Sequence, residues 1–383
     1  MLHPSKIEIS KSAFKANIKF IKSKLKKGVR FSSVVKGNAY GHGIEVFVPL
    51  AEEEGVDHFS VFSADEAMRV MRVSKQKPDI MIMGMIDDDS LEWCVRSGFE
   101  CFVFDFERLQ KLIQVAKNTG IKAKIHIELE TGMNRTGFDE QELDALIKLL
   151  QKNKERYVLK GICTHFAGAE SLANYVRITG QKSKFRKFNK KFQKAGFEPE
   201  YRHTACSAAA VRYPDTQMDL VRIGILQYGF WPSTETLVQH TANVESQSDP
   251  LKRLISWKSN VMSIKNVNKG EYIGYGMTFL AQQNMKLAVV PVGYHHGFSR
   301  SLSNLGRLII GGQRVSVVGL VNMNALLVDI TNCNHIERGD EVILIGRQGD
   351  VEISVAAFGE LSNRLNYELL TRIPLDIPRK VVL

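Results

Sequence analysis

The chain has 383 residues, 44% of them hydrophobic and 24% charged, which is typical of a folded globular protein and excludes an intrinsically disordered one. Its 52 Lys and Arg residues against 41 Asp and Glu residues give a net charge of +11, which raises the alternative of a nucleic-acid or anionic membrane partner. No apolar run reaches the roughly 18 residues of a membrane span, and the start, MLHPSKIEIS, lacks the apolar core of an export signal, so we expect a cytoplasmic protein.

The basic residues concentrate in residues 19–27, which contain Phe20, and in residues 181–197, where phenylalanines recur at helical spacing opposite the charges. This pattern predicts solvated helix faces, and the nucleic-acid alternative then depends on charge alone. The cysteines are odd in number and scattered, so they predict neither a disulfide framework nor a zinc site: Cys94, Cys101, Cys163, Cys206 and Cys333.

In chain order, short apolar runs alternate with amphipathic segments over about the first 225 residues, which is the rhythm of βα units. Eight runs are predicted as strands: 31–35, 57–62, 79–83, 101–104, 123–129, 159–165, 201–205 and 220–224. Eight units favour a (β/α)8 barrel of the TIM type, because closure removes the sheet edges. An open doubly wound sheet is the alternative.

From about residue 245 the pattern changes to short β-like runs separated by turns, which indicates a mostly-β second domain in an α/β protein. We expect SQSDP at 246–250 to be the junction and the glycine pair at 311–312 to be a hairpin turn. The predicted domains are 1–245 and 246–383, and the first ten or so residues are candidates for packing with the second domain.

Polar side chains lie in the predicted barrel strands or directly after them, toward the ends where barrel enzymes do their chemistry. They are Lys36, Glu128, Arg135, His165, His203 and Arg222. Each alone is more often a structural residue, but their convergence on one rim predicts an active site.

The stretch VVKGNAYGHG at 34–43 places Lys36 at such a strand end. A partly desolvated lysine has a lowered pKa, and its neutral amine attacks aldehydes to form a Schiff base. Gly37, Gly41 and Gly43 let the backbone turn into a helix whose first amides could meet a phosphate. An aldehyde and a phosphate on one molecule indicate pyridoxal phosphate.

Nine motifs together resemble the alanine racemase family of pyridoxal-phosphate enzymes over nearly the whole chain: VVKGNAYGHG, ETGMNRTGF, THFAGAE, HTACSAAA, DLVRIGILQYG, GYGMTF, PVGYHHGF, VVGLVNMNALLVDIT and NYELLTRIP. The resemblance implies a homodimer with an N-terminal barrel and a C-terminal β domain that completes the partner's active site. It also implies interconversion of L- and D-alanine, an isomerase reaction that supports cell-wall biosynthesis.

Carried over by position, Lys36 resembles the Schiff-base lysine and Tyr275 the second base, supplied by the partner subunit. Arg222 resembles the arginine that faces the pyridine nitrogen, with His203 behind it. His165 corresponds to the histidine beside the catalytic tyrosine. A phenolate needs positive neighbours to serve as a base near neutrality, and His165 and, through it, Arg222 are the predicted source.

The remaining family positions fall into two groups. Those that resemble the phosphate-binding residues are Tyr40, Ser207, Gly224, Ile225 and Tyr367. Those on the substrate side are Arg135, which supports the substrate carboxylate, Met323, whose backbone amide meets that carboxylate, and Tyr294 at the entrance.

The sequence departs from the family at several of these places. Glu128 stands where the family usually has a lysine, often carbamylated, and we expect its carboxylate to replace the carbamate toward Arg135. The other departures are Cys206 for Asn, Asn322 and Asn324 for Cys and Asp, and His295 and His296 for Ala and Asp. They leave serine or a broader set of amino acids as alternative substrates. The two adjacent histidines lack a third ligand nearby, so no metal is expected.

Two further alternatives stay open. A pyridoxal-phosphate decarboxylase can use the same barrel, but the second domain lacks its usual cysteine or acidic pocket. A non-catalytic pyridoxal-phosphate-binding protein has the barrel and the lysine without a β domain, so Tyr275 and the residues after the barrel disfavour it.

Overall fold

The computed structural model describes residues 3–242, 248–355 and 366–383, without the side chains of residues 366 and 367. It divides into two compact units. We call Ala13–Lys36 with Phe47–Arg253 the barrel unit, and Met1–Ser12, Gly37–Val46 and Leu254–Leu383 the β unit. The expected junction at 246–250 lies partly outside the described residues.

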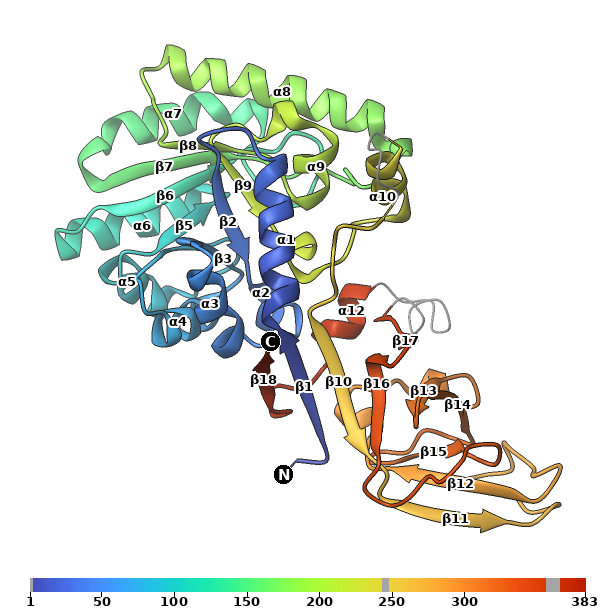
Figure 1. The fold of residues 1–383 in the computed structure, drawn as a ribbon. Helices are drawn as coiled ribbons and strands as arrows, with labels where there is room; N and C mark the ends of the chain where they lie inside the picture. Colours follow the sequence, from blue (N-terminus) through green and yellow to red (C-terminus); the bar gives the residue numbers. More distant parts are fainter. Residues whose placement is uncertain (1–2, 243–247, 356–365) are drawn as a thin grey trace. The chain divides into compact units, whose positions relative to one another are not determined.

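Eight parallel strands form the sheet of the barrel unit (Figure 1). They are β2 (Arg30–Val34), β3 (His58–Val61), β4 (Asp79–Ile82), β5 (Glu100–Val103), β6 (Ala123–Glu128), β7 (Tyr157–Cys163), β8 (Tyr201–His203) and β9 (Leu220–Ile223). All eight predicted runs are confirmed as strands. The order β8-β7-β6-β5-β4-β3-β2-β9 closes through two backbone hydrogen bonds, from the Asp219 amide to the Arg202 carbonyl and from the Arg222 amide to the Ala205 carbonyl. The barrel prediction is confirmed.

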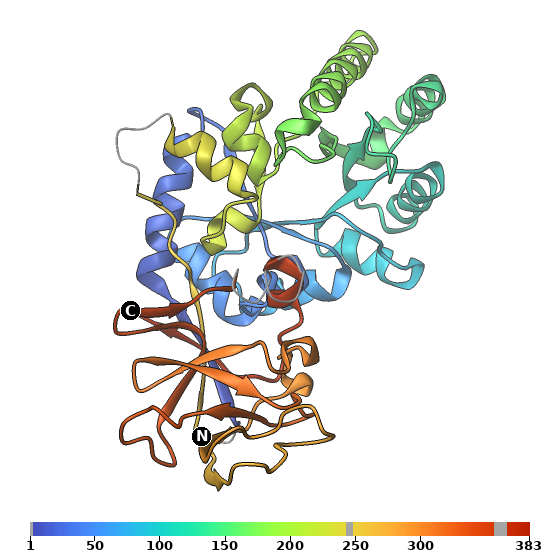
Figure 2. The same cartoon turned by 90° about the vertical axis from the view of Figure 1, so that its right-hand side faces the viewer.

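Helices follow the strands and lie outside them (Figures 1 and 2). They are α3 (Ile44–Glu53), α4 (Ala64–Val73), α5 (Asp88–Arg96), α6 (Phe106–Thr119), α7 (Leu143–Lys152), α8 (Tyr175–Lys194), α9 (Ser207–Arg212) and α10 (Thr234–Thr241), after the N-terminal α1 (Lys11–Lys24). Their buried side chains recur at three- and four-residue spacing, as with Leu143, Leu146, Ile147 and Leu150 of α7. None of the helices in the described parts is long and apolar enough to cross a bilayer.

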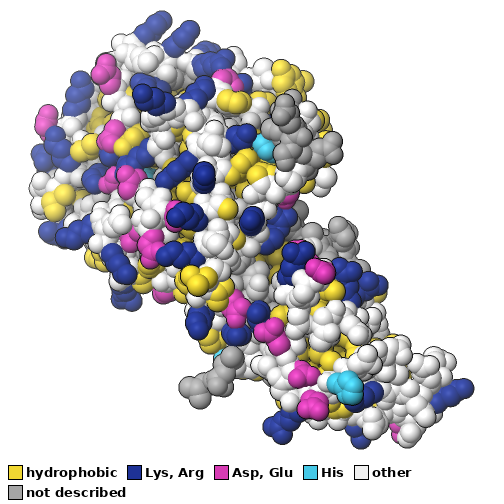
Figure 3. Space-filling view, viewed as in Figure 1, with side chains coloured by type: hydrophobic (Ala, Val, Ile, Leu, Met, Phe, Trp, Pro, Cys, Tyr) yellow, Lys and Arg dark blue, Asp and Glu magenta, His cyan; other side chains and the backbone are white. Residues whose placement is uncertain are grey.

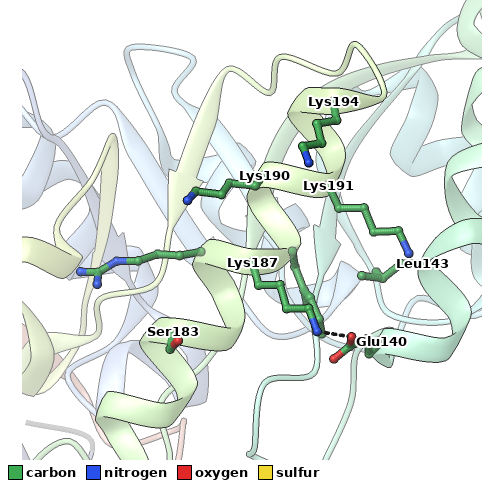
Figure 4. A pocket seen from close by; sticks show the side chains of 9 residues that line it. Glu140, Leu143, Ser183, Lys187, Lys190, Lys191 and Lys194 are labelled. Atoms are coloured by element: carbon green, nitrogen blue, oxygen red, sulfur yellow. Dashed lines mark hydrogen bonds and ion pairs between the residues drawn. The ribbon is translucent and has the colours of Figure 1, made fainter.

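The basic segment 181–197 lies on α8 and has the two faces that its spacing predicts. Phe185, Phe188 and Phe192 are buried on one side. On the other, basic side chains pair with acids, namely Lys182 and Arg186 with Asp215 at 2.7 and 2.9 Å, Lys191 with Asp144 at 2.8 Å, and Lys187 with Glu140. Of these residues, Glu140, Arg186, Lys187 and Lys191 line a shallow pocket between α7 and α8 (Figure 4). Acidic side chains are interspersed with the Lys and Arg side chains over the face drawn in Figure 3. The solvated-face interpretation is confirmed.

The β unit contains a ten-stranded sheet in the order β11-β12-β15-β14-β13-β16-β10-β1-β18, with β17 paired to β16. Its strands are β1 (Ser5–Ser10), β10 (Ile255–Asn260), β11 (Ser263–Val267), β12 (Met285–Val290), β13 (Arg307–Ile310), β14 (Gln313–Val318), β15 (Leu326–Asp329), β16 (Glu341–Gln348), β17 (Val351–Ile353) and β18 (Arg379–Val382); a short helix, α12 (Asn366–Thr371), precedes β18. Gly311 and Gly312 join β13 to β14 with φ of 58° and 73°, which confirms the predicted hairpin turn.

The residues after Lys36 form a left-handed turn, labelled α2 (Lys36–Tyr40). Asn38, Ala39 and Tyr40 have φ of 55°, 51° and 52°, a region that costs a non-glycine residue about 1–2 kcal/mol. Hydrogen bonds within the turn hold it, and Asn38 Oδ1 accepts the Ile44 amide at 3.2 Å. The helix expected after Gly43 therefore begins at Ile44 with its first amide bound to Asn38. Strain of this kind is tolerated chiefly where a function requires the geometry.

Candidate active site

Lys36 lies two residues after the end of β2, at the rim where the barrel strands end. Desolvation by the surrounding protein lowers its pKa, and the positive charges of Arg135 and Arg222 lower it further, while Glu66 acts in the opposite direction. The lowered pKa is the property that the sequence predicted for a reactive amine.

Arg222 is buried on β9 and its guanidinium is held from two sides. Nη1 donates to His203 Nδ1 at 2.9 Å, and Nη2 donates to the Thr164 carbonyl at 2.7 Å. The predicted pair of Arg222 and His203 therefore exists. The cation has no carboxylate partner among the described residues, so no paired anion neutralises the positive charge that Arg222 adds to the rim.

His165 follows β7, and its carbonyl accepts a hydrogen bond from Gln181 Nε2 at 2.9 Å. Burial, together with the charges of Arg222, Arg135 and Lys36, lowers the pKa of His165 to about 3. The imidazole is therefore neutral near pH 7. The positive charge of this rim comes from Arg222, Arg135 and Lys36. His165 itself is uncharged, so the positive neighbours that a phenolate needs are these three residues and not the imidazole.

Ser207, Gly224 and Ile225 come together where β8 and β9 end. Ser207 is the first residue of α9, and its Oγ accepts the Gly224 amide at 2.9 Å. Cys206 precedes it in extended conformation and forms an isolated bridge with Arg222. Of the other two predicted phosphate-binding residues, Tyr40 belongs to the β unit and the side chain of Tyr367 lies outside the described residues.

Glu128 and Arg135 lie at the two ends of the loop after β6, but the described structure contains no hydrogen bond or ion pair between them. Glu128 is buried and accepts the hydroxyl of Thr136 at 2.8 Å, while Arg135 is exposed. Glu130, which was not among the predicted site residues, holds the loop by accepting the amides of Gly132 and Asn134. Glu128 therefore reaches Arg135 only through the neighbouring Thr136.

The β unit carries Tyr275, Tyr294 and Met323 on neighbouring loops. Gly319, in the loop of Met323, lies close to the Ile273 carbonyl in the loop of Tyr275. The amides of Tyr294 and His295 donate to the carbonyls of Asn322 and Met323, both at 3.0 Å. Gly274 and Gly276, at φ of 75° and 68°, flank Tyr275 in its own turn. The three side chains are 72%, 42% and 56% exposed, respectively. Large apolar and aromatic groups exposed together are typical of a surface that meets another molecule.

Three polar residues inside the barrel were not predicted as part of the site: His58, His126 and Glu100. Their signal in the sequence is weak, since each lies in or beside a short apolar run, where one polar residue does not by itself indicate a site. The described residues contain no group of three or more His, Cys, Asp or Glu side chains placed to hold a metal ion.

The barrel unit therefore presents an amine with a lowered pKa, a fixed guanidinium, and a serine hydroxyl beside the backbone of residues 224–225. These groups suit, in turn, an aldehyde, a ring nitrogen that accepts a hydrogen bond, and a phosphate. The residues fit pyridoxal phosphate, and they define a barrel enzyme of the kind that acts on amino groups.

Comparison with known proteins agrees with this class. The model of the alanine racemase N-terminal domain matches residues 9–232, and that of the C-terminal domain matches residues 254–381. The chain is 33% identical to an alanine racemase of Leptospira interrogans, covering 99% of this chain and 96% of that protein, and 32% identical to one of Methanococcus maripaludis, covering 98% of each.

Solved structures give the same result. The alanine racemase of Clostridium difficile 630 has a TM-score of 0.91 at 30% identity, and that of Bacillus anthracis with bound L-Ala-P has 0.90 at 30% identity; each comparison covers 100% of this chain and 96% of the other. The chain belongs to the alanine racemase family, whose members are pyridoxal-phosphate-dependent amino-acid racemases.

Proposed function

We propose that the protein is a cytoplasmic homodimer that interconverts L- and D-alanine, with Lys36 of one subunit and Tyr275 of the other as the two bases. The observation that carries the proposal is the combination of a lysine of lowered pKa and a fixed Arg222 on one barrel rim, in a chain that matches alanine racemases from end to end. In this proposal residues 1–245 bind the cofactor, and residues 246–383 complete the partner's site. The D-alanine formed serves cell-wall biosynthesis.

Inversion at the α-carbon requires that a proton leave one face and that another be delivered to the opposite face, so two bases must flank the substrate. Pyridoxal phosphate, when bound, supplies the aldehyde that captures the substrate amine and a ring that withdraws electrons from the α-carbon. Lys36 holds or releases the proton on one face, helped by its lowered pKa. The phenol of Tyr275 does the same on the other face.

Two features of Tyr275 support its action on a second copy of the chain. Its side chain is largely exposed on the β unit, and it shares that surface with Tyr294 and Met323, the predicted substrate-side residues. A two-fold dimer is the commonest arrangement for a soluble homo-oligomer, and it would place this surface over a partner's rim twice.

Arg222 is proposed to direct the reaction toward racemisation. A guanidinium does not give up its proton, so Arg222 would leave the ring nitrogen of the bound cofactor unprotonated, and the ring would supply a weaker electron acceptor. The proton that Lys36 or Tyr275 returns would then go to the α-carbon of the substrate.

We expect Arg222→Glu to release more pyruvate from alanine per racemisation event, because a carboxylic acid can protonate the ring nitrogen and promote transamination. Pyruvate is measured enzymatically beside the change in optical rotation. Arg222→Lys, which keeps the positive charge, is the matched control and should not raise the pyruvate fraction. An unchanged fraction in Arg222→Glu would contradict the assigned role.

Glu128 is proposed to replace a carbamylated lysine by holding the Arg135 loop through Thr136. Glu128→Gln is expected to raise KM for alanine by about tenfold, with a smaller effect on kcat, since the amide still accepts the Thr136 hydroxyl but the loss of the charge weakens that hydrogen bond by about 1–1.5 kcal/mol. Thr136→Val should cause a change in the same direction. Mass spectrometry of the intact protein should show no carbamate. An unchanged KM in both variants would rule out this role.

Alanine is the proposed substrate, with serine or a broader set of amino acids as the alternative that Asn322, Asn324, His295 and His296 leave open. The test incubates the protein and pyridoxal phosphate with a panel of L-amino acids in deuterated water. Loss of optical rotation together with deuterium at the α-carbon identifies racemisation and ranks the substrates. Neither signal with any amino acid would favour a non-catalytic pyridoxal-phosphate-binding protein.

A further inference from the structure

A continuous chain of hydrogen bonds runs through the buried interior of the barrel from Arg222 to Glu100. Arg222 Nη1 lies 2.9 Å from His203 Nδ1, and His203 Nε2 lies 2.9 Å from His126 Nδ1. His126 Nε2 lies 2.8 Å from Glu100 Oε2, which also meets His58 Nε2 at 3.1 Å. The chain thus passes from β9 through β8 and β6 to the first residue of β5. All four side chains beyond Arg222 are fully buried.

The chemistry of its two ends fixes the direction of every hydrogen bond in the chain. A guanidinium can only donate, so His203 Nδ1 must carry a lone pair and His203 Nε2 must carry the proton. His126 then accepts at Nδ1 and donates from Nε2. An ionised carboxylate can only accept, which is what Glu100 Oε2 must do for both His126 and His58.

The charges agree with this direction. Burial tends to raise the pKa of Glu100, but hydrogen bonds from His126 and His58 outweigh it and hold the pKa far below the usual range. Burial lowers the pKa of His126 and of His203. The chain therefore consists of an anion, two neutral imidazoles and a cation. Lys160 Nζ, 3.3 Å from Glu100 Oε1, supplies the nearest opposite charge and also pairs with Glu200 at 2.6 Å.

Gly161 on β7 leaves room for the middle of the chain. A Cβ atom at this position would lie 2.2 Å from His126 Nδ1 and 2.9 Å from His203 Nε2, the two atoms that share the hydrogen bond. Its φ is not positive, so the backbone itself could accept an alanine. Glycine is needed here because any side chain would separate the two imidazoles.

We propose that Glu100 is a positioning residue for the reaction: through His126 and His203 it fixes the tautomers that make Arg222 donate to His203, and so holds the guanidinium in place toward the cofactor ring. The part concerning the cofactor rests on the proposed function. The part concerning the hydrogen-bond chain concerns the protein alone and can be tested without the cofactor.

The first test is histidine 15N NMR on the unaltered protein, with and without pyridoxal phosphate, because the two neutral imidazole tautomers have different 15N shifts. His126 and His203, assigned with single His→Gln variants, should each be protonated at Nε2 and not at Nδ1. A proton on His203 Nδ1, or on both of its nitrogens near pH 7, would overturn the proposal.

The second test is Glu100→Gln. Lys160 can only donate, so the new amide should turn its oxygen toward Lys160 and its NH2 group toward His126 and His58. His126 must then accept at Nε2 and donate from Nδ1 to His203 Nε2, so every hydrogen bond of the chain reverses its direction. His203 then carries its proton on Nδ1, and this N–H faces the N–H donor of Arg222 Nη1. In the holoenzyme kcat should fall by about 10- to 100-fold, the range seen when partners behind metal-ligating side chains are removed, with little change in KM.

Three further variants separate this role from a general loss of stability. Gly161→Ala should lower kcat similarly by wedging the imidazoles apart while removing no polar group. Lys160→Gln added to Glu100→Gln offers an acceptor to the new amide, which should restore the original tautomers and part of kcat. Glu200→Gln makes the same chemical change outside the hydrogen-bond chain, and it should change neither the histidine tautomers nor kcat. If Glu100→Gln and Gly161→Ala keep kcat within about twofold of the unaltered enzyme, the positioning role is wrong.

The two proposals can fail separately. If the protein racemises no amino acid but His126 and His203 have the stated tautomers, the hydrogen-bond chain stands and the proposed function fails. If the protein racemises alanine but the tautomers differ from those stated, the proposed function stands and the hydrogen-bond chain fails.

Discussion

Replacing Lys36 with alanine is expected to lower kcat/KM for alanine racemisation in both directions by at least about 10³-fold, because one side chain both anchors the cofactor and serves as a base. The pKa of Lys36 is lowered by desolvation and by Arg135 and Arg222, so its amine is suited to both tasks. Two measurements check this result: the change in optical rotation, and mass spectrometry after borohydride reduction, which detects covalently held cofactor.

Lys15→Ala on the exposed face of α1 is the control for the loss of one lysine, and it should keep both activity and attached cofactor. If Lys36→Ala still carried reducible cofactor at another lysine and racemised alanine within about tenfold of the unaltered enzyme, the identification of the reactive amine would be wrong.

Tyr275→Phe has the second largest expected effect, a loss of about 10²- to 10⁴-fold in racemisation, because it removes the acid–base group on one face only. The remaining base should still exchange the α-proton of one alanine enantiomer with solvent without inverting it. The other enantiomer should exchange much more slowly. NMR of each enantiomer in deuterated water measures exchange and inversion separately.

Tyr272→Phe is the matched control, since Tyr272 is a second exposed tyrosine three residues away. It should racemise alanine normally. Equal exchange of both enantiomers in Tyr275→Phe, or full racemisation, would mean that another group acts as the second base.

The sequence alone was sufficient to predict the strands and the closed barrel, because each buried strand is a short apolar run between amphipathic segments. It also located Lys36, His203 and Arg222, since strand ends converge on one rim. The left-handed turn at Asn38, Ala39 and Tyr40 could not be predicted. Non-glycine residues by themselves disfavour a positive φ, and only the surrounding structure holds these three in that conformation.

Other features depend on distances that spacing along the chain does not contain. The neutral state of His165 follows first from its burial and then from three cations on separate strands and loops. The contact of Glu128 with Thr136 depends on how the loop after β6 folds back. The alignment of His126 with His203 depends on a register shift beside His126 in the β6 and β7 pairing, and on the missing side chain of Gly161.

The central claim, that Lys36 of one subunit and Tyr275 of the other serve one site, is tested most directly by mixing Lys36→Ala and Tyr275→Phe chains. Each variant alone should be almost inactive. After subunit exchange at equal concentrations, about half the dimers are hybrids with one intact site each, so about a quarter of normal activity should return. If the mixture remained inactive while mass spectrometry confirmed hybrid dimers, both residues would act within one chain or not at all, and the account would be contradicted.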